Sequence, residues 1–121
     1  MSQNEPDRAF DARALDNLLE IIGGDRDALA DLIDSFLAEG PGLMGRIEAA
    51  ASDDNAEALR QAAHTMKSSA ADFGAMDLSR LCHALETLGR SGSTEGAVPL
   101  AQEASASYRA AAVALRGVIN G

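Results

Sequence analysis

Aromatic side chains are scarce in this chain of 121 residues, where they account for 3%, and tryptophan is absent. β-Branched residues are also few, whereas alanine and leucine dominate the 46% of residues that are hydrophobic. Strands draw mainly on aromatic and β-branched side chains, while alanine and leucine favour helices. The composition therefore predicts an all-α fold, and the length is that of one domain.

Basic residues are in short supply as well. Ten lysines and arginines face 19 acidic residues, which gives a formal net charge of −9, and Lys67 is the single lysine. A nucleic-acid backbone repels such a surface unless a local basic cluster compensates, and the sequence contains no such cluster. Nucleic-acid binding is therefore not expected.

Cysteine pairs and long apolar runs are missing too. Cys82 is the one cysteine, so the chain has no internal disulfide. No run approaches the ~18 apolar residues of a membrane helix, and residues 1–8 do not resemble a signal peptide. These features predict a cytoplasmic protein with no membrane segment, in which residues 1–8 are a disordered lead-in and residues 9–121 form the domain.

Residues 26–50 show helical periodicity that continues across a proline. Pro41 would normally break a helix, because it has no N–H to donate and crowds the preceding turn. The apolar residues after Pro41 nevertheless stay in phase with those before it at ~100° per residue. The pattern predicts one long helix, capped by Asp25 and bent near Pro41.

The remaining apolar periodicity predicts four more helices. A short one follows Phe10 and ends at Gly23-Gly24, with Asp11 as N-cap. The second of these helices opens with Asp54 and ends at Gly74. The third ends at Gly89, and the fourth runs from within residues 94–98 to about Ile119. Asp54 and Glu57 have the spacing of a capping box. Short connections favour antiparallel neighbours, so we expect an up-down-up-down four-helix bundle with an additional short N-terminal helix.

His64 is the residue that points to chemistry. It lies ~140° from the buried stripe of its helix, so its imidazole faces solvent. The side chains that share its face are three, four or seven positions away: Glu57, Arg60, Gln61, Lys67, Ser68 and Ala71.

A solvent-facing imidazole suits a phosphoryl acceptor. A free imidazole is largely neutral at pH 7, and the neutral ring is a nucleophile. Phosphorylation would add about two negative charges, which Lys67 or Arg60 would offset. The geometry alone also fits an ordinary solvated histidine, because exposed histidines near lysines occur on many helices.

The amino-acid sequence around His64 favours the phosphoryl acceptor over the ordinary solvated histidine. Residues 64–74, His-Thr-Met-Lys-Ser-Ser-Ala-Ala-Asp-Phe-Gly, closely resemble the signature of histidine-phosphotransfer (HPt) domains. That signature has an acceptor histidine, an apolar residue two positions on, lysine three on, small residues next, then an apolar residue and a glycine about ten on. The flanks agree: Asp54 and Leu59 precede the histidine at similar distances, and residues 81–86 resemble the following helix. The resemblance covers roughly residues 10–119.

The resemblance implies roles for individual residues. His64 would be the phosphorylated residue, Lys67 would stabilise the phosphoryl charge, and Gly74 would permit the turn into the next helix. Ser68 departs from the family, which most often has glycine there, and this affects which receivers dock and how fast transfer is.

The resemblance also implies the partners. The sequence has no glycine-rich nucleotide loop, so kinase activity is not expected, and the protein would be a phosphoryl carrier with a covalent phosphohistidine intermediate. The implied donors and acceptors are aspartyl phosphates on response-regulator receiver domains, which would supply Mg²⁺. No cofactor is expected of the chain itself. The predicted docking surface is centred on Arg60, Gln61, Lys67, Ser68 and Ala71, with Phe10 and Leu15 at its rim.

Three functional readings remain open. The chain is a relay between two receivers, or it is phosphorylated directly by a kinase on another chain, like the phosphotransfer domain of chemotaxis-type kinases, or it is a helical interaction module that is never phosphorylated. The partners that the resemblance implies are receiver domains, a hybrid sensor histidine kinase, or both. His64 and Lys67 together argue against the third reading, and the sequence does not separate the first two. A monomer is expected, because the buried stripes account for most apolar residues.

The remaining candidate residues have structural readings. His83 is predicted on the polar side of the fourth helix, Cys82 on its buried side, and Met76 exposed near its start. Two histidines and an inward cysteine offer no metal site.

Overall fold

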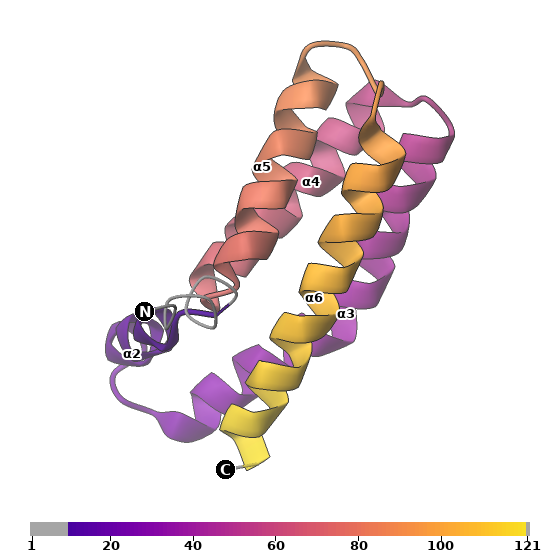
Figure 1. Cartoon of the computed structure of the whole chain (residues 1–121). Coiled ribbons are helices and arrows are strands. Elements are labelled where there is room, and N and C mark those ends of the chain that lie inside the picture. The colour runs from indigo at the N-terminus through magenta and orange to yellow at the C-terminus, as the bar shows by residue number, and fades with distance from the viewer. Residues whose placement is uncertain (1–9, 121) are drawn as a thin grey trace, which may run out of the picture.

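The computed structural model describes residues 10–120, which contain five helices and no strand. The predicted disorder of residues 1–8 concerns a segment outside the described residues. The helices are α2 (Ala12–Ile21), α3 (Arg26–Ser52), α4 (Ala56–Asp72), α5 (Met76–Arg90) and α6 (Ala97–Asn120) (Figure 1). No helix in residues 10–120 is both long and apolar enough to cross a membrane.

Helices α3 to α6 form an antiparallel four-helix bundle, and α2 packs at one end of it (Figure 1). Helix α4 contacts α3 and α5, and α6 contacts the same two helices from the other side. The helices therefore follow one another around the bundle in chain order, with the α4–α5 seam opposite the α3–α6 seam. The predicted fold class is confirmed.

The helix starts show one error in the sequence prediction. Asp11 and Asp25 cap α2 and α3 as expected, each through a side chain that accepts a main-chain hydrogen bond. For α4 the cap is Asn55, whose side chain accepts from the main-chain N–H of Ala58 at 3.0 Å. Asp54 instead lies in the turn with φ at 55°, a left-handed conformation in which it cannot cap the helix.

The other helix ends lie close to their predicted places. Helix α5 continues one residue past Gly89, to Arg90, and α6 begins within the predicted window. Gly74 lies in the turn between α4 and α5 with φ at +84°. A Cβ there would collide with the main chain of Asp11, so this close approach also requires glycine.

The long helix predicted across Pro41 is confirmed, because α3 continues through it. Pro41 has no N–H to donate to the carbonyl of Leu37. The hydroxyl group of Tyr108, on α6, donates towards that carbonyl at 3.3 Å and lies 3.4 Å from the carbonyl of Phe36. Gly40 is buried beneath the tyrosine ring, where a Cβ would collide with it.

The aromatic residues Phe36, Phe73 and Tyr108 gather at the level of Pro41. The ring of Phe36 lies 4.8 Å from that of Phe73 and 5.6 Å from that of Tyr108, measured between centroids. Phe73 immediately follows α4, so this cluster fixes the end of the helix that carries His64. The rest of the core is aliphatic and rich in alanine.

Candidate functional site

Helix α4 presents His64 away from the core. Ala63 and Met66, beside it in sequence, are 0% and 1% exposed, whereas the imidazole side chain is 57% exposed. The inward face of α4 consists of small and aliphatic side chains that pack against α3 and α5. This packing holds the histidine on a rigid helix.

A buried carboxylate lies beneath the imidazole. Glu86, on α5, is 1% exposed, and its Oε2 atom is 2.8 Å from Nδ1 of His64. An ionised carboxylate only accepts hydrogen bonds, so Nδ1 carries the proton and donates it to Glu86. In the neutral ring the lone pair is then on Nε2, which makes no hydrogen bond within the described part of the chain.

Two cations hold Glu86 in its ionised form. Nζ of Lys67 is 2.7 Å from Oε1, and the guanidinium of Arg90 is 2.7 Å from Oε2. The hydrogen bond from Lys67 is the main cause that lowers the pKa of Glu86 to about 2; burial opposes it, and the bond from His64 adds to it. The carboxylate is therefore charged at neutral pH, and the contacts with Lys67 and Arg90 offset the cost of burying that charge.

Arg60 and Gln61 bind a carboxylate on their own helix. Both side chains bind Glu57, with the guanidinium of Arg60 at 2.5 Å and the amide of Gln61 at 3.0 Å. The hydrogen bond that Arg60 donates to Glu57 lowers the pKa of Glu57 and raises the pKa of Arg60. Lys67 and Arg90 are thus the cations linked to His64 through Glu86, whereas the charge of Arg60 is offset by Glu57 on its own helix.

The surface around His64 is otherwise made of small side chains. Ser68 and Ala71 are both exposed, one and two turns further along α4. The predicted rim is partly wrong: Leu15 is 6% exposed and belongs to the core, because α2 turns it inward, whereas Phe10 is half-buried. Met76 is half-buried rather than exposed.

Glu86 and Arg90 are the site residues that the sequence analysis did not single out. A signal was present, because Glu86 lies in phase with the buried stripe of Cys82, Leu85 and Gly89. A charged residue at a buried position needs a partner, and Arg90 follows at four-residue spacing. The pairing with His64 crosses from α5 to α4, so periodicity within one helix did not show it.

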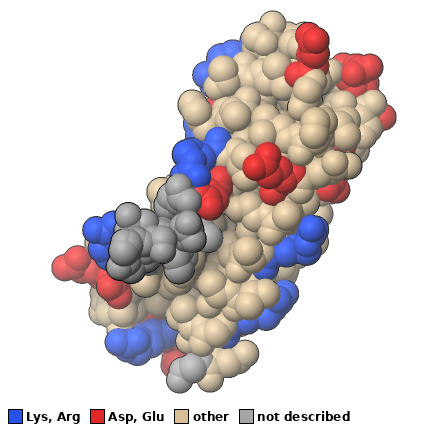
Figure 2. Space-filling view, in the orientation of Figure 1, with Lys and Arg blue, Asp and Glu red and all other residues tan. Residues whose placement is uncertain are grey.

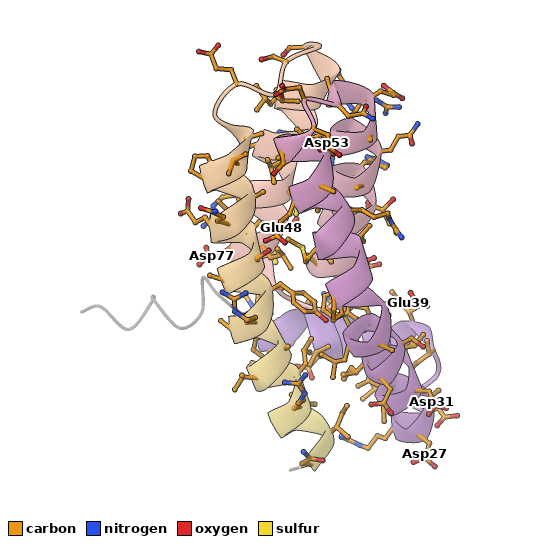
Figure 3. The ribbon with its side chains drawn as sticks, turned by 90° about the vertical axis from the view of Figure 1, so that its right-hand side faces the viewer. Asp27, Asp31, Glu39, Glu48, Asp53 and Asp77 are labelled. Carbon is orange, nitrogen blue, oxygen red and sulfur yellow. The ribbon has the colours of Figure 1, made fainter. Side chains whose placement is uncertain are left out.

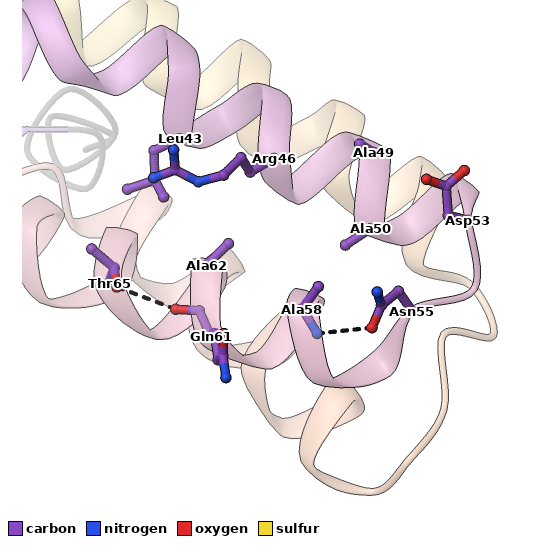
Figure 4. A pocket seen from close by; sticks show the side chains of 10 residues that line it. All are labelled: Leu43, Arg46, Ala49, Ala50, Asp53, Asn55, Ala58, Gln61, Ala62 and Thr65. Atoms are coloured by element: carbon purple, nitrogen blue, oxygen red, sulfur yellow. Dashed lines mark hydrogen bonds between the residues drawn. The ribbon is translucent and has the colours of Figure 1, made fainter.

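A groove runs along the seam between α3 and α4 (Figure 4). It has a volume of about 420 Å³, and Arg46 on α3 faces Thr65 on α4 across it. A second hollow of about 260 Å³ continues it towards Phe73 and shares Leu43, Arg46 and Thr65. Thr65 lines both hollows, whereas the imidazole of His64, the preceding residue, points towards Glu86 on α5.

The second histidine and the cysteine lie outside this site. His83 is exposed, and Cys82 is 0% exposed, as expected. Burial raises the pKa of the Cys82 thiol to about 12, so it is a packing residue rather than a nucleophile. Among residues 10–120, no three histidine, cysteine or acidic side chains are grouped to hold a metal ion.

Comparison of the chain with known protein families finds a match. The family model described as the Hpt domain matches residues 31–117, which include His64, Lys67, Glu86 and Arg90. The chain belongs to the Hpt domain family. This Hpt domain has a histidine phosphotransfer role in phosphorelay. No curated protein matched it in a sequence comparison.

Solved structures share the fold of this Hpt domain. Histidine-containing phosphotransfer protein B from Pseudomonas aeruginosa PAO1 is 25% identical with a TM-score of 0.84, and the match covers 93% of this chain and 95% of that one. The HPT domain of a sensor hybrid histidine kinase from Shewanella is 17% identical with a TM-score of 0.72, covering 88% and 92%.

Proposed function

We propose that His64 is the phosphoacceptor of this Hpt domain and that it exchanges a phosphoryl group with aspartates of receiver domains. The observation that carries this proposal is the pairing of its exposed imidazole with the buried carboxylate of Glu86 at 2.8 Å. The hydrogen bond leaves the lone pair on the outward nitrogen and fixes the ring, as in-line transfer requires.

The forward step is a displacement at phosphorus. Nε2 of His64 attacks the phosphorus atom of an aspartyl phosphate, an N–P bond forms, and the P–O bond to the aspartate breaks. The bonding electrons leave with the aspartate as a carboxylate. The ring becomes positively charged, and Glu86 stabilises it through the proton that stays on Nδ1.

The reverse step uses the same contacts. A receiver aspartate attacks the phosphorus atom, the N–P bond breaks, and its electrons return to Nε2 as the lone pair of a neutral imidazole. Because Nδ1 remains protonated throughout, no proton has to move. The protein is thus a carrier that returns to its starting state after each transfer.

Lys67 and Arg90, which pair with Glu86, are also proposed to stabilise the negative charge of the phosphoryl group. Both cations reach Glu86 from the rim of the site, with side chains that are 28% and 63% exposed. Their charge lies near the position that the phosphoryl oxygens would occupy on Nε2, so they would offset its negative charge. Lys67, the less exposed of the two, has the better-defined position.

The receiver is proposed to dock over the outward face of α4. Its central contacts would be Arg60, Gln61, Ser68 and Ala71, with the α3–α4 groove at the edge. Exposed small side chains allow a close approach, and the receiver would bring its own acidic pocket and Mg²⁺. Such signalling contacts are usually small and transient.

The partners of this proposal are response-regulator receiver domains and, in the alternative relay order, a hybrid sensor histidine kinase. The Shewanella match supports the second class, since that HPT domain is part of such a kinase. A reducing cytoplasm is proposed as the location, which the buried thiol of Cys82 fits.

His64→Gln tests the assignment, with His83→Gln as the matched control on the exposed side of α5. After incubation with a phosphorylated receiver domain, acid-labile phosphate should appear in the wild type and in the control but not in His64→Gln. Circular dichroism should show all three to be equally helical. Phosphate retained by folded His64→Gln would refute the site, and its absence from all three would favour an unphosphorylated interaction module.

A further inference from the structure

The last part of the chain differs in charge from the rest. All 19 acidic residues lie at or before Glu103, so residues 104–121 contain none, although the chain carries a net charge of −9. The same stretch contains Arg109 and Arg116, both exposed on α6. Figure 2 shows basic side chains along this side of the molecule with no acidic side chain between them.

These arginines border a groove between α3 and α6. The groove has a volume of about 530 Å³, and its apolar lining includes Pro41, Met44 and Val113. Val113 is 68% exposed, which is high for an aliphatic side chain between two arginines. Neither arginine has an ion-pair partner among residues 10–120.

The neighbouring face of α3 carries the opposite charge. Asp27, Asp34, Pro41 and Glu48 are spaced by seven residues, so they lie nearly in line along one side of the helix. Pro41 and Glu48 line the groove, which places Asp27 and Asp34 on the same side further along. Figure 3 shows Asp27 at the N-terminal end of α3 and Glu48 near the seam with α6.

The two charged pairs match in spacing. Arg109 and Arg116 are seven residues apart on α6, as Asp27 and Asp34 are on α3, so each pair spans ~10.5 Å of helix. Arg109 and Arg116 line the groove with Pro41 and Glu48, so the acidic pair lies further along, towards the N-terminus of α3. A face on which a basic stripe is followed by an acidic stripe of equal length is self-complementary under a two-fold axis. We propose that the α3–α6 face pairs two copies of this chain, with Arg109 and Arg116 of each copy opposite Asp27 and Asp34 of the other.

The pairing is compatible with phosphotransfer. The α3–α6 seam is opposite the α4–α5 seam where His64 meets Glu86, so His64 of each copy stays open to receivers. The net negative charge opposes association at long range, but salt at physiological strength screens charges beyond ~8 Å. Contacts between the stripes are shorter than that. The proposal of a weak dimer differs from the monomer that the sequence predicts, and the oligomeric state in solution distinguishes the two.

Sedimentation velocity at about 150 mM salt tests the proposal. Between about 10 µM and about 500 µM, which covers the range of weak dissociation constants, the average mass should rise from 12.5 kDa towards twice that value. The double variant Arg109→Glu and Arg116→Glu should remain at monomer mass. The matched control, Arg13→Glu with Arg80→Glu, changes the net charge equally at sites away from this face and should behave as the wild type.

A charge swap identifies the contact. Adding Asp27→Arg and Asp34→Arg to the double variant should restore the rise in mass. Wild type that stays monomeric at every concentration overturns the dimer. Association of the double variant equal to wild type, or no recovery in the swapped variant, overturns the stripe pairing. Circular dichroism and His64 phosphorylation show that each variant is folded.

Discussion

The hydroxyl group of Tyr108 lies 3.3 Å from the main-chain carbonyl of Leu37, the carbonyl that Pro41 leaves without a helical donor. Helix α6 thus supplies a hydrogen bond that α3 lacks at its bend. The contact stabilises a continuous α3, and the aromatic cluster around it reaches Phe73 at the end of α4. Tyr108, on the last helix, therefore helps to position α4, the helix that carries His64.

Tyr108→Phe should lower the free energy of unfolding by about 1 kcal/mol, because a part-buried carbonyl loses its donor while the ring still packs. Gly40→Ala should cost about 1–3 kcal/mol, since its Cβ collides with the ring. Urea unfolding measures both. Gly42→Ala is the control, because a Cβ at Gly42 meets nothing within 4 Å. A Gly40→Ala variant as stable as this control would contradict the packing.

Acid should remove the stabilisation that Glu86 provides. Its pKa in the folded protein is lowered to about 2, below the ordinary value of 4.5, so the contribution is complete above pH 4.5 and is lost as the pH falls towards 2. At pH 7, Glu86→Gln should therefore be less stable than the wild type by about 2 kcal/mol, and the difference should shrink towards pH 2. Urea midpoints across this pH range measure it. Glu103→Gln, on the exposed side of α6, should track the wild type throughout, and a pH-independent difference for Glu86→Gln would rule out the linkage.

Lys67→Ala should slow phosphoryl transfer about tenfold to a hundredfold, because a cation beside the developing phosphoryl charge is lost. Arg90→Ala should have a smaller effect, since its side chain is more exposed. Single-turnover transfer from a phosphorylated receiver gives the rates, and Arg80→Ala on the same helix is the control. Should Lys67→Ala transfer at the wild-type rate, Arg90 would be the relevant cation.

Ala71→Arg should block docking without affecting the chemistry of His64. A long side chain on the exposed face of α4 holds a receiver away, so transfer from a receiver should fall at least tenfold, equal to ~1.4 kcal/mol. Phosphorylation by a small donor such as phosphoramidate should stay unchanged. The exposed Ala110→Arg on α6 should leave both reactions unaltered. Equal losses with both donors would show damage to the site rather than to docking.

The fold class, the helix through Pro41 and the outward direction of His64 were all predictable from the amino-acid sequence. Each of these follows from apolar periodicity within one helix, which residues three and four apart impose locally. The cap at Asn55 was missed because both Asp54 and Asn55 are good capping residues, and the φ of 55° at Asp54 is set by the turn.

The contacts beneath the histidine depend on how the helices pack against one another. Glu86 reaches His64, Lys67 and Arg90 because α4 and α5 pack at a particular rotation, and no spacing within either helix specifies that rotation. The same holds for Tyr108 and Leu37, which are 71 residues apart in the chain. Contacts between helices depend on how the side chains of both interdigitate, which is a property of the assembled core.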